Sequence, residues 1–153
     1  MNFLELKIPP PIIGLCLCVL MWFTPPLAGT VDLPLGVRIA IALAFVIVGQ
    51  SIAIAGVVEF RRAKTTINPI KASSASSLVT GGIYRYTRNP MYVGMLLTIL
   101  GWAAYLSNPL TLLFAPAFVL YMNRFQIKPE ERVLTTLFGA PYAAYTGRVR
   151  RWI

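Results

Sequence analysis

Apolar and polar residues alternate along this chain in long blocks. Four blocks are apolar, and none carries more than two charged residues; they cover residues 12–28, 36–60, 91–106 and 110–126. About 20 apolar residues in a helix suffice to cross the roughly 30 Å hydrocarbon layer of a bilayer. The pattern therefore predicts an all-α, polytopic membrane protein with about four transmembrane helices.

The first apolar block has two interpretations. Pro25 and Pro26 must end or bend it, since proline interrupts a helix. A cleaved signal peptide would also be apolar, but the residues before the block form a weak n-region, with Glu5 and Lys7 followed by three prolines. We therefore favour a retained membrane helix.

Two polar, basic blocks separate and follow these segments. Residues 61–90 form a long Ser/Thr-rich connection, and long loops of this kind are often functional. In residues 127–153, Pro129 followed by two glutamates predicts a helix start, and a second short helix is expected after Gly139. This tail is too polar to span a membrane, so it should lie on the membrane surface or fold back onto the helix ends.

These blocks divide the chain into two parts. Residues 1–60 form a pair of N-terminal transmembrane helices. Residues 61–153 combine a loop, a helical hairpin and a helical tail, and they carry most of the polar side chains.

Composition supports the membrane assignment and orients it. The chain is 57% hydrophobic and only 12% charged, with a mean hydropathy of +0.68, which is unusual for a soluble domain. Four spans would put every Lys and Arg except Arg38 on the side that holds both termini. The positive-inside rule then makes that side cytoplasmic, as in a multi-pass protein of a bacterial inner membrane. The same rule accounts for the net charge of +9 without a nucleic-acid partner.

The ionisable residues narrow the possible chemistry. The sequence has no histidine and two cysteines, Cys16 and Cys18, inside the first apolar block. A zinc site needs about four nitrogen or sulfur ligands, so we predict no metal site and interpret the cysteines as apolar filler.

Topology should bring two distant polar segments together. The join between the third and fourth apolar blocks is only Ser-Asn-Pro, so these helices should be antiparallel neighbours. Gly94 and Gly101 lie seven residues apart and would allow close helix contact. The glutamate pair of the tail should therefore lie near Arg88, Asn89 and Pro90, about 40 residues earlier.

The residues that meet there suit a charged nucleoside ligand. Glycines 81 and 82 offer bare backbone, and Tyr84, Tyr86 and Tyr92 offer ring faces for a planar group or a cation. A carboxylate pair could bind ribose hydroxyls or an amino group. The alternative is that the tyrosines form an interfacial belt and the glutamates form surface ion pairs.

Two motifs in this half resemble a known superfamily. GGIYRYTRNPMYVG at residues 81–94, a short helical hairpin, and then EERVLTTLFGAPYAAYTGRVRR at 130–151 are similar to the integral-membrane methyltransferases. This superfamily includes isoprenylcysteine carboxyl methyltransferases and phospholipid methyltransferases. The resemblance covers about residues 65–152. It implies S-adenosylmethionine as the methyl donor, bound on the cytoplasmic side.

The resemblance also implies which residues form the site. Those expected to contact the cofactor are Gly82, Tyr84, Arg88, Asn89, Pro90, Tyr92, Glu130, Glu131, Tyr142 and Tyr145. Among them, Arg88, Asn89 and Glu131 are expected to be catalytic. Isoprenylcysteine methyltransferases usually have Arg-His-Pro where this chain has Arg-Asn-Pro, and Asn89 cannot carry a proton at neutral pH.

The acceptor is expected to be lipophilic and held in the membrane. A carboxylate acceptor would need a cation to orient it, and Arg85, Arg88 and Arg148 are candidates. An amine acceptor would have to lose a proton, with Glu130, Glu131 or a tyrosine assisting. Monomer and dimer remain open.

Two other functions are compatible with parts of the pattern. Sterol C14 reductases share related C-terminal architecture and use NADPH, but they are much larger. A non-enzymatic scaffold with a basic cytoplasmic face would bind anionic lipid or a partner, and it would not bind a nucleoside.

Overall fold

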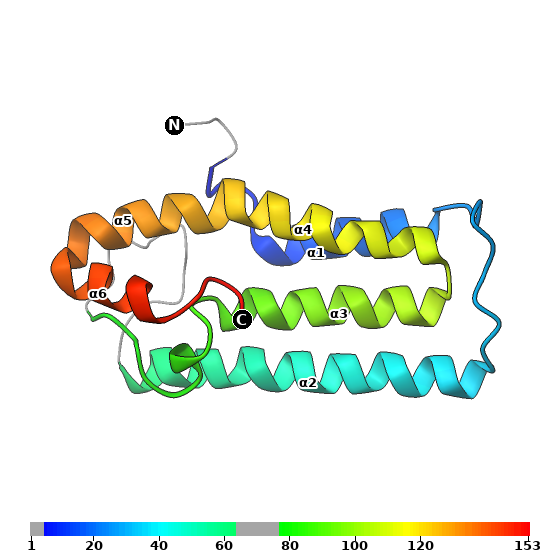
Figure 1. Cartoon of the computed structure of the whole chain (residues 1–153), viewed down its shortest axis with the longest axis horizontal. Helices are drawn as coiled ribbons and strands as arrows, with labels where there is room; N and C mark the ends of the chain where they lie inside the picture. The colour runs from blue at the N-terminus through cyan, green and yellow to red at the C-terminus, as the bar shows by residue number, and fades with distance from the viewer. Residues whose placement is uncertain (1–4, 64–76) are drawn as a thin grey trace.

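The computed structural model describes residues 5–63 and 77–153, and every regular element in these ranges is helical (Figure 1). Part of the polar connection predicted at 61–90 thus lies outside the described residues. The α-helices are α1 (Pro10–Trp22), α2 (Leu35–Arg62), α3 (Pro90–Leu106), α4 (Phe114–Met122), α5 (Lys128–Phe138) and α6 (Ala140–Arg148). Shorter turns are the 3₁₀ segments η2 (Gly82–Arg85) and η3 (Pro109–Leu113) and the π-turn η4 (Asn123–Ile127).

The apolar blocks become helices largely where they were predicted. Prolines 10 and 90 occupy first-turn positions of α1 and α3, where the missing N–H removes no helical hydrogen bond. The first helix ends at Trp22, before the two prolines that were expected to end or bend it. α6 also confirms the predicted second tail helix.

An α-helix, α5, begins beside Pro129 as predicted, at Lys128, with Glu130 and Glu131 in its first turn, but no break separates it from the helix before it. η3, α4, η4 and α5 form one continuous helical run from Pro109 to Phe138, and Ile127 just before the proline is itself helical, with φ −66° and ψ −50°. Proline has no N–H to give the carbonyl four residues earlier, that of Phe125. The backbone N–H of Leu6 donates to that carbonyl instead, at 3.0 Å. The N-terminal segment thus satisfies the acceptor that Pro129 leaves free.

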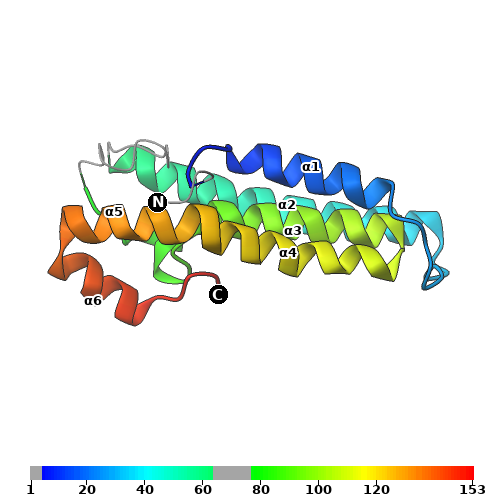
Figure 2. The same ribbon diagram turned by 90° about the horizontal axis from the view of Figure 1, so that it is seen from above.

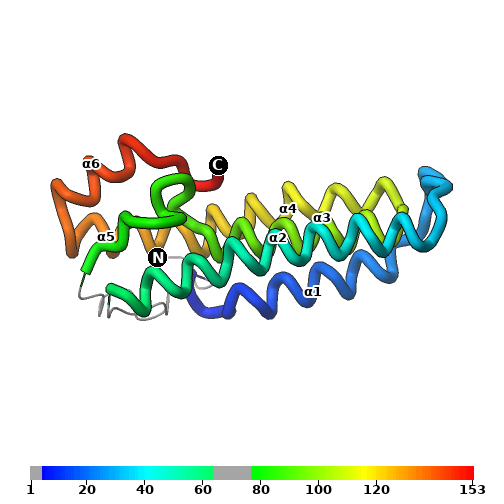
Figure 3. The backbone as a smooth tube through the Cα atoms, turned by 90° about the horizontal axis from the view of Figure 1, so that it is seen from below, coloured from blue at the N-terminus to red at the C-terminus, as the bar shows by residue number. Residues whose placement is uncertain are grey.

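The long helices lie side by side in the order α2, α3, α4, with α1 on one face (Figure 2). α6 lies on the opposite face from α1, as the view from below also shows (Figure 3). α5 continues α4 past the start of α3, and α6 turns back toward it (Figure 1). The tail therefore folds back onto the helix ends, which was one of its two expected placements.

Glycines allow α2 and α3 to pack very closely. A Cβ at Gly49 would lie 2.6 Å from the Gly94 carbonyl oxygen, and a Cβ at Gly94 would collide with the carbonyl of Gly49. A Cβ at Gly101 would lie 2.9 Å from Cβ of Phe45. Gln50 adds an interhelical hydrogen bond from its Nε2 to Oγ1 of Thr98, at 3.3 Å. The close contact predicted for Gly94 and Gly101 is confirmed.

The outer surface of the bundle is strongly apolar. Leu15, Leu43, Ile47, Ile54 and Leu120 are all more than half exposed. Two helices, Leu35–Arg62 and Pro109–Phe138, are long and apolar enough to cross a membrane, whereas α1 and α3 are shorter apolar helices. Such a surface would be poorly solvated by water and fits contact with lipid.

Candidate active site

The start of α3 is attached to the C-terminal end of the chain by backbone and side-chain hydrogen bonds. The N–H of Arg88 donates to the carbonyl of Arg150 at 3.0 Å. Nδ2 of Asn89 donates to the carbonyl of Arg151 at 2.9 Å, and Oγ1 of Thr87 donates to the same carbonyl at 3.2 Å. Asn89 therefore uses one of its two amide N–H groups to position the tail.

Glu131 lies between two arginines from opposite ends of this region. Nη1 of Arg88 is 3.0 Å from Oε1 of Glu131. Arg151 donates to both carboxylate oxygens, from Nε at 2.8 Å and from Nη2 at 2.6 Å. This bidentate contact is the strong form of an Arg–carboxylate pair and raises the pKa of Arg151. One carboxylate thus fixes two guanidinium groups at the mouth of α3.

Glu130, the neighbouring carboxylate, has a different partner. The hydroxyl of Tyr92, in the first turn of α3, donates to Oε1 of Glu130 at 2.6 Å. Glu130 forms no ion pair within residues 5–63 and 77–153. Loss of hydration raises the pKa of its carboxyl to about 7, the Tyr92 hydrogen bond opposes that rise, and the charge of Glu131 adds to it. Adjacent residues on a helix point about 100° apart, which explains the two environments.

Three tyrosines form an aromatic cluster beside these charges. Tyr84, Tyr142 and Tyr145 are each less than 6% exposed. The hydroxyl of Tyr145 donates to the carbonyl of Tyr84 at 2.8 Å, which joins α6 to η2. Burial raises the pKa of Tyr142 to about 12, with Glu131 adding to the rise and Arg88 opposing it. These phenols remain protonated at neutral pH and can act as hydrogen-bond donors rather than as bases.

The glycine pair lies against the end of α2. Gly82 has φ +54°, in the left-handed region that favours glycine, and a Cβ there would lie 2.6 Å from Oε1 of Glu59. The ring of Phe60, next along α2, meets that of Tyr84 edge-on, with centroids 5.5 Å apart. The bare backbone expected to face a ligand therefore faces the Glu59 carboxyl at Gly82.

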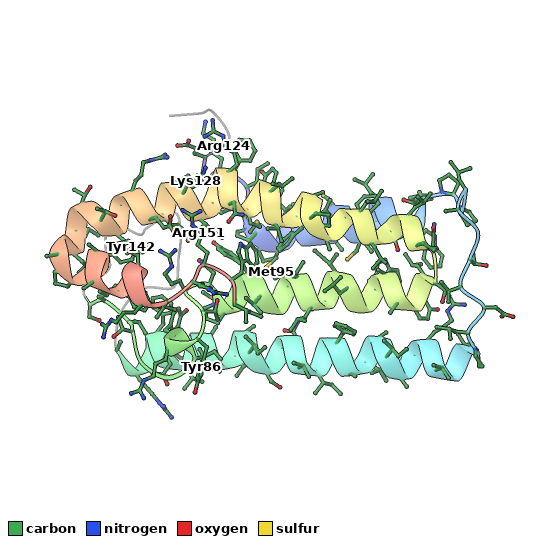
Figure 4. The ribbon with its side chains drawn as sticks, in the orientation of Figure 1. Tyr86, Met95, Arg124, Lys128, Tyr142 and Arg151 are labelled. Carbon is green, nitrogen blue, oxygen red and sulfur yellow. The ribbon has the colours of Figure 1, made fainter. Side chains whose placement is uncertain are left out.

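The C-terminus closes the region from the side of α4. Nε1 of Trp152 donates to Oδ1 of Asn123, the first residue of the π-turn, at 3.1 Å. π-turns inside α-helices occur often at functional sites. Figure 4 shows Arg151 and Tyr142 on the tail side of this region, while Tyr86 lies at the outer side near α2 and is 72% exposed.

The structure thus brings the predicted residues together at one end of the bundle. The convergence of Glu130 and Glu131 with the Arg88 turn, inferred from topology, is confirmed by the ion pair and the Tyr92 hydrogen bond. Tyr86 was expected to offer its ring to a ligand, but it points away from the cluster. The sequence analysis missed Glu59, Arg151 and Trp152. For Arg151 and Trp152, the available signal was a charged and an aromatic residue at the end of the chain.

One buried donor in this region has no partner. Nε of Arg88 is inaccessible to solvent and makes no hydrogen bond, while the side chain is only 14% exposed. Buried polar atoms without partners are rare and call for an explanation. A bound group with an acceptor atom would supply the missing hydrogen bond.

Comparison with known proteins points to one family. The profile of the phospholipid methyltransferase family matches residues 37–141, which extends from α2 into α6. An uncharacterized protein of Haemophilus influenzae is 43% identical over 63 residues, which is 41% of this chain and the whole of that protein. A probable protein-S-isoprenylcysteine O-methyltransferase of Oryza sativa subsp. indica is 35% identical over 112 residues, 71% of this chain and 57% of the relative.

A similar match is found with protein-S-isoprenylcysteine O-methyltransferase A of Arabidopsis thaliana. It is 34% identical over 110 residues, covering 70% of this chain and 54% of the relative. The chain therefore spans about half the length of these methyltransferases. No solved structure matches the chain.

Proposed function

The chain belongs to the phospholipid methyltransferase family, and from this membership we propose that it is a multi-pass membrane enzyme that transfers a methyl group from S-adenosylmethionine to a lipophilic acceptor. The acceptor is an isoprenylcysteine-like carboxylate or a phospholipid amine. The observation that carries the proposal is the cluster at the mouth of α3, where Glu131 pairs with Arg88 and Arg151 beside the Tyr92–Glu130 hydrogen bond.

The residues present suit such a donor. Its amino-acid carboxylate can accept the unpaired Nε–H of Arg88, and its base or sulfonium would lie beside the buried cluster of Tyr84 and Tyr142. When bound, S-adenosylmethionine supplies a methyl group on a positively charged sulfur, and in-line attack by the acceptor forms the new bond as the carbon–sulfur bond breaks and leaves a neutral thioether. The protein contributes mainly orientation and electrostatics to such a step.

The charges at the mouth of α3 depend on Glu130. Arg88 and Arg151 carry two positive charges and Glu131 one negative charge. Ionised Glu130 makes this set neutral, and protonated Glu130 leaves it with one positive charge. Since its pKa is about 7, Glu130 can accept a proton near neutral pH, which an ammonium acceptor must lose. A carboxylate acceptor needs no base, and the single net positive charge that remains when Glu130 is protonated would attract it.

Membrane embedding is part of the proposal. We place α1 to α4 across the bilayer, with the tail, the η2 loop and the site on the cytoplasmic side. α1 and α3 are about 20 and 26 Å long at 1.5 Å per residue, so both are short for a roughly 30 Å layer. The apolar part of the last span ends at Met122, before Arg124, and α5 continues into the cytoplasm. Reporter fusions after Pro34 and after Ile153 should report opposite sides; the same side for both would refute this topology.

Calorimetric titration with S-adenosylhomocysteine tests the donor assignment. We expect detergent-purified protein to bind it and not NADPH, and we expect Arg88→Ala and Glu131→Gln to lose binding while keeping their helical circular dichroism. Glu5→Gln is the matched control, because Glu5 pairs with Arg132 outside the cluster. Binding retained by both site variants would remove the site assignment, and binding of NADPH alone would favour a reductase.

A non-enzymatic scaffold makes the opposite prediction. Folded protein that binds neither nucleoside would favour the scaffold over the enzyme. For the enzyme, a screen of lipid extracts with labelled methyl donor would identify the acceptor. Methylation of water-soluble acceptors alone would contradict a lipophilic acceptor.

A further inference from the structure

An apolar hollow lies at the end of the bundle away from the arginine–glutamate cluster. It is a hollow of about 640 Å³ between α1 and α2, with α3 as its floor. Its walls include Leu15 and Val19 of α1 and Leu43 and Val46 of α2, and almost all of its lining is apolar. The lining residues of α3 run from Thr98 to Tyr105, a length of about 10 Å at 1.5 Å per residue.

A row of stacked side chains crosses this hollow at its outer end. The rings of Trp22 and Trp102 stack with centroids 5.9 Å apart, and those of Trp102 and Tyr105 with centroids 5.2 Å apart. The guanidinium of Arg38 lies over the Tyr105 ring, 5.4 Å from its centroid. The row therefore runs from α1 through α3 to α2 and ends in a positive charge.

The walls of the hollow are held in place by hydrogen bonds. Nε1 of Trp102 donates to the carbonyl of Cys18 at 3.0 Å, which joins α3 to α1. Nε of Arg38 donates to the carbonyl of Tyr105 at 2.6 Å, and Nη2 donates to the same oxygen, which joins α2 to α3. The site is thus preorganised, so binding would order few side chains.

Arg38 has binding capacity left. A guanidinium has five N–H groups, and two of its nitrogens donate to the Tyr105 carbonyl. No carboxylate forms an ion pair with Arg38 in the part of the chain that the structure describes. Arg38 lies in the first turn of α2, at the end of that helix away from the site.

We propose that this hollow binds a phospholipid of the bilayer leaflet opposite the site, with its phosphate on Arg38 and one acyl chain along α3 between α1 and α2. The proposal rests on the membrane embedding inferred above and not on the methyltransferase reaction. Polarity and charge select the ligand. The apolar hollow accepts a hydrocarbon chain, and the guanidinium of Arg38 at its rim accepts a phosphate.

Other occupants fit less well. A helix of a second copy would touch this hollow over only about two turns, and it would leave Arg38 without an anion. The lipophilic acceptor would place its reactive group near Glu130, and α6 and the tail lie on the opposite face of the bundle from α1 (Figures 2 and 3). The site is therefore separate from the catalytic one.

Quenching of tryptophan fluorescence by a brominated phospholipid tests the proposal locally. Trp22 and Trp102 line the hollow, and Trp152→Phe removes the third tryptophan. We expect phosphatidylglycerol with brominated acyl chains, added in mixed micelles, to quench saturably. Arg38→Gln should weaken the apparent affinity about tenfold, the factor for losing roughly one charged hydrogen bond. Arg61→Gln, at the other end of the same helix, should leave it unchanged.

Several outcomes would overturn the proposal. If Arg38→Gln binds the brominated lipid as tightly as the native protein does, the charge plays no part. If inorganic phosphate alone prevents the quenching, the site binds an ion and not a lipid. A dimer that dissociates on Leu43→Trp would make the hollow a contact between copies. If Trp152→Phe does not fold, native mass spectrometry of the chain with all three tryptophans replaces the quenching assay. One retained phosphatidylglycerol that is lost in Arg38→Gln but not in Arg61→Gln supports the proposal. Retention of the lipid in both variants refutes it.

Discussion

Gly82 offers a sharp test of how α2 supports the site, because a side chain added there would meet Glu59 of α2. Gly82 and Gly139 have almost the same backbone φ, +54° and +53°. A Cβ at Gly139 would meet nothing within 4 Å, whereas one at Gly82 would lie 2.6 Å from the Glu59 carboxyl. The two positions are not equivalent in ψ, because Gly139 has ψ −125°, so the backbone penalty for alanine there is a separate quantity; only alanine at Gly82 adds a collision.

The magnitudes can be worked from these contacts. Left-handed backbone costs an L-residue roughly 1–2 kcal/mol, and Gly82→Ala incurs this cost. At Gly82 the new methyl group falls about 0.8 Å inside ordinary contact at 3.4 Å, and the Glu59 side chain must move. An off-rotamer side chain costs about 0.5–1.5 kcal/mol, and a weakened exposed Glu59–Arg62 pair at most about 1 kcal/mol. Gly82→Ala should therefore lose about 2–4 kcal/mol.

Unfolding of the variants in mixed micelles measures these differences. In a Glu59→Ala background, Gly82→Ala should lose only the backbone cost of roughly 1–2 kcal/mol. S-adenosylhomocysteine binding should weaken in Gly82→Ala, because the same turn carries Tyr84 into the aromatic cluster, and it should persist in Gly139→Ala. Equal losses from Gly82→Ala in the native and the Glu59→Ala backgrounds would refute the contact between Glu59 and the glycine turn.

The remaining predictions concern other contacts of the bundle. Glu130 has a raised pKa, so the folded state holds its proton between about pH 4.5 and 7; stability should fall as pH rises through that range, and Glu130→Gln should flatten the slope measured by unfolding. Tyr92→Phe removes a hydrogen bond that lowers the pKa of Glu130, so the stability of this variant should keep falling to a higher pH than that of the native protein. An unchanged dependence of stability on pH would contradict the Glu130 assignment. Arg151→Lys cannot form the bidentate pair and should weaken nucleoside binding about tenfold with the helices intact, whereas equal binding would make Arg151 dispensable. Cys16→Ser with Cys18→Ser should leave binding unchanged in the same titration, and a loss would disprove their role as filler.

Much of this architecture is visible in the hydrophobic pattern. Long apolar blocks determine where helices form in a membrane, because a backbone in lipid must satisfy its own hydrogen bonds. The short Ser-Asn-Pro join determines that α3 and α4 are antiparallel, and this alone predicts that Glu130 and Glu131 lie near Arg88. Whether these residues bind the donor is still a prediction.

Other features depended on contacts between segments far apart in the sequence. The continuity of the helix through Pro129 could not be predicted, because the partner of the Phe125 carbonyl is Leu6, more than a hundred residues earlier. Glu59 was missed because nothing local indicates that α2 ends against the glycine turn. The sequence alone determined which segments are helical and which ends they share. Tertiary packing decided which side chain meets which, since those hydrogen bonds and close approaches arise only when separate helices come together.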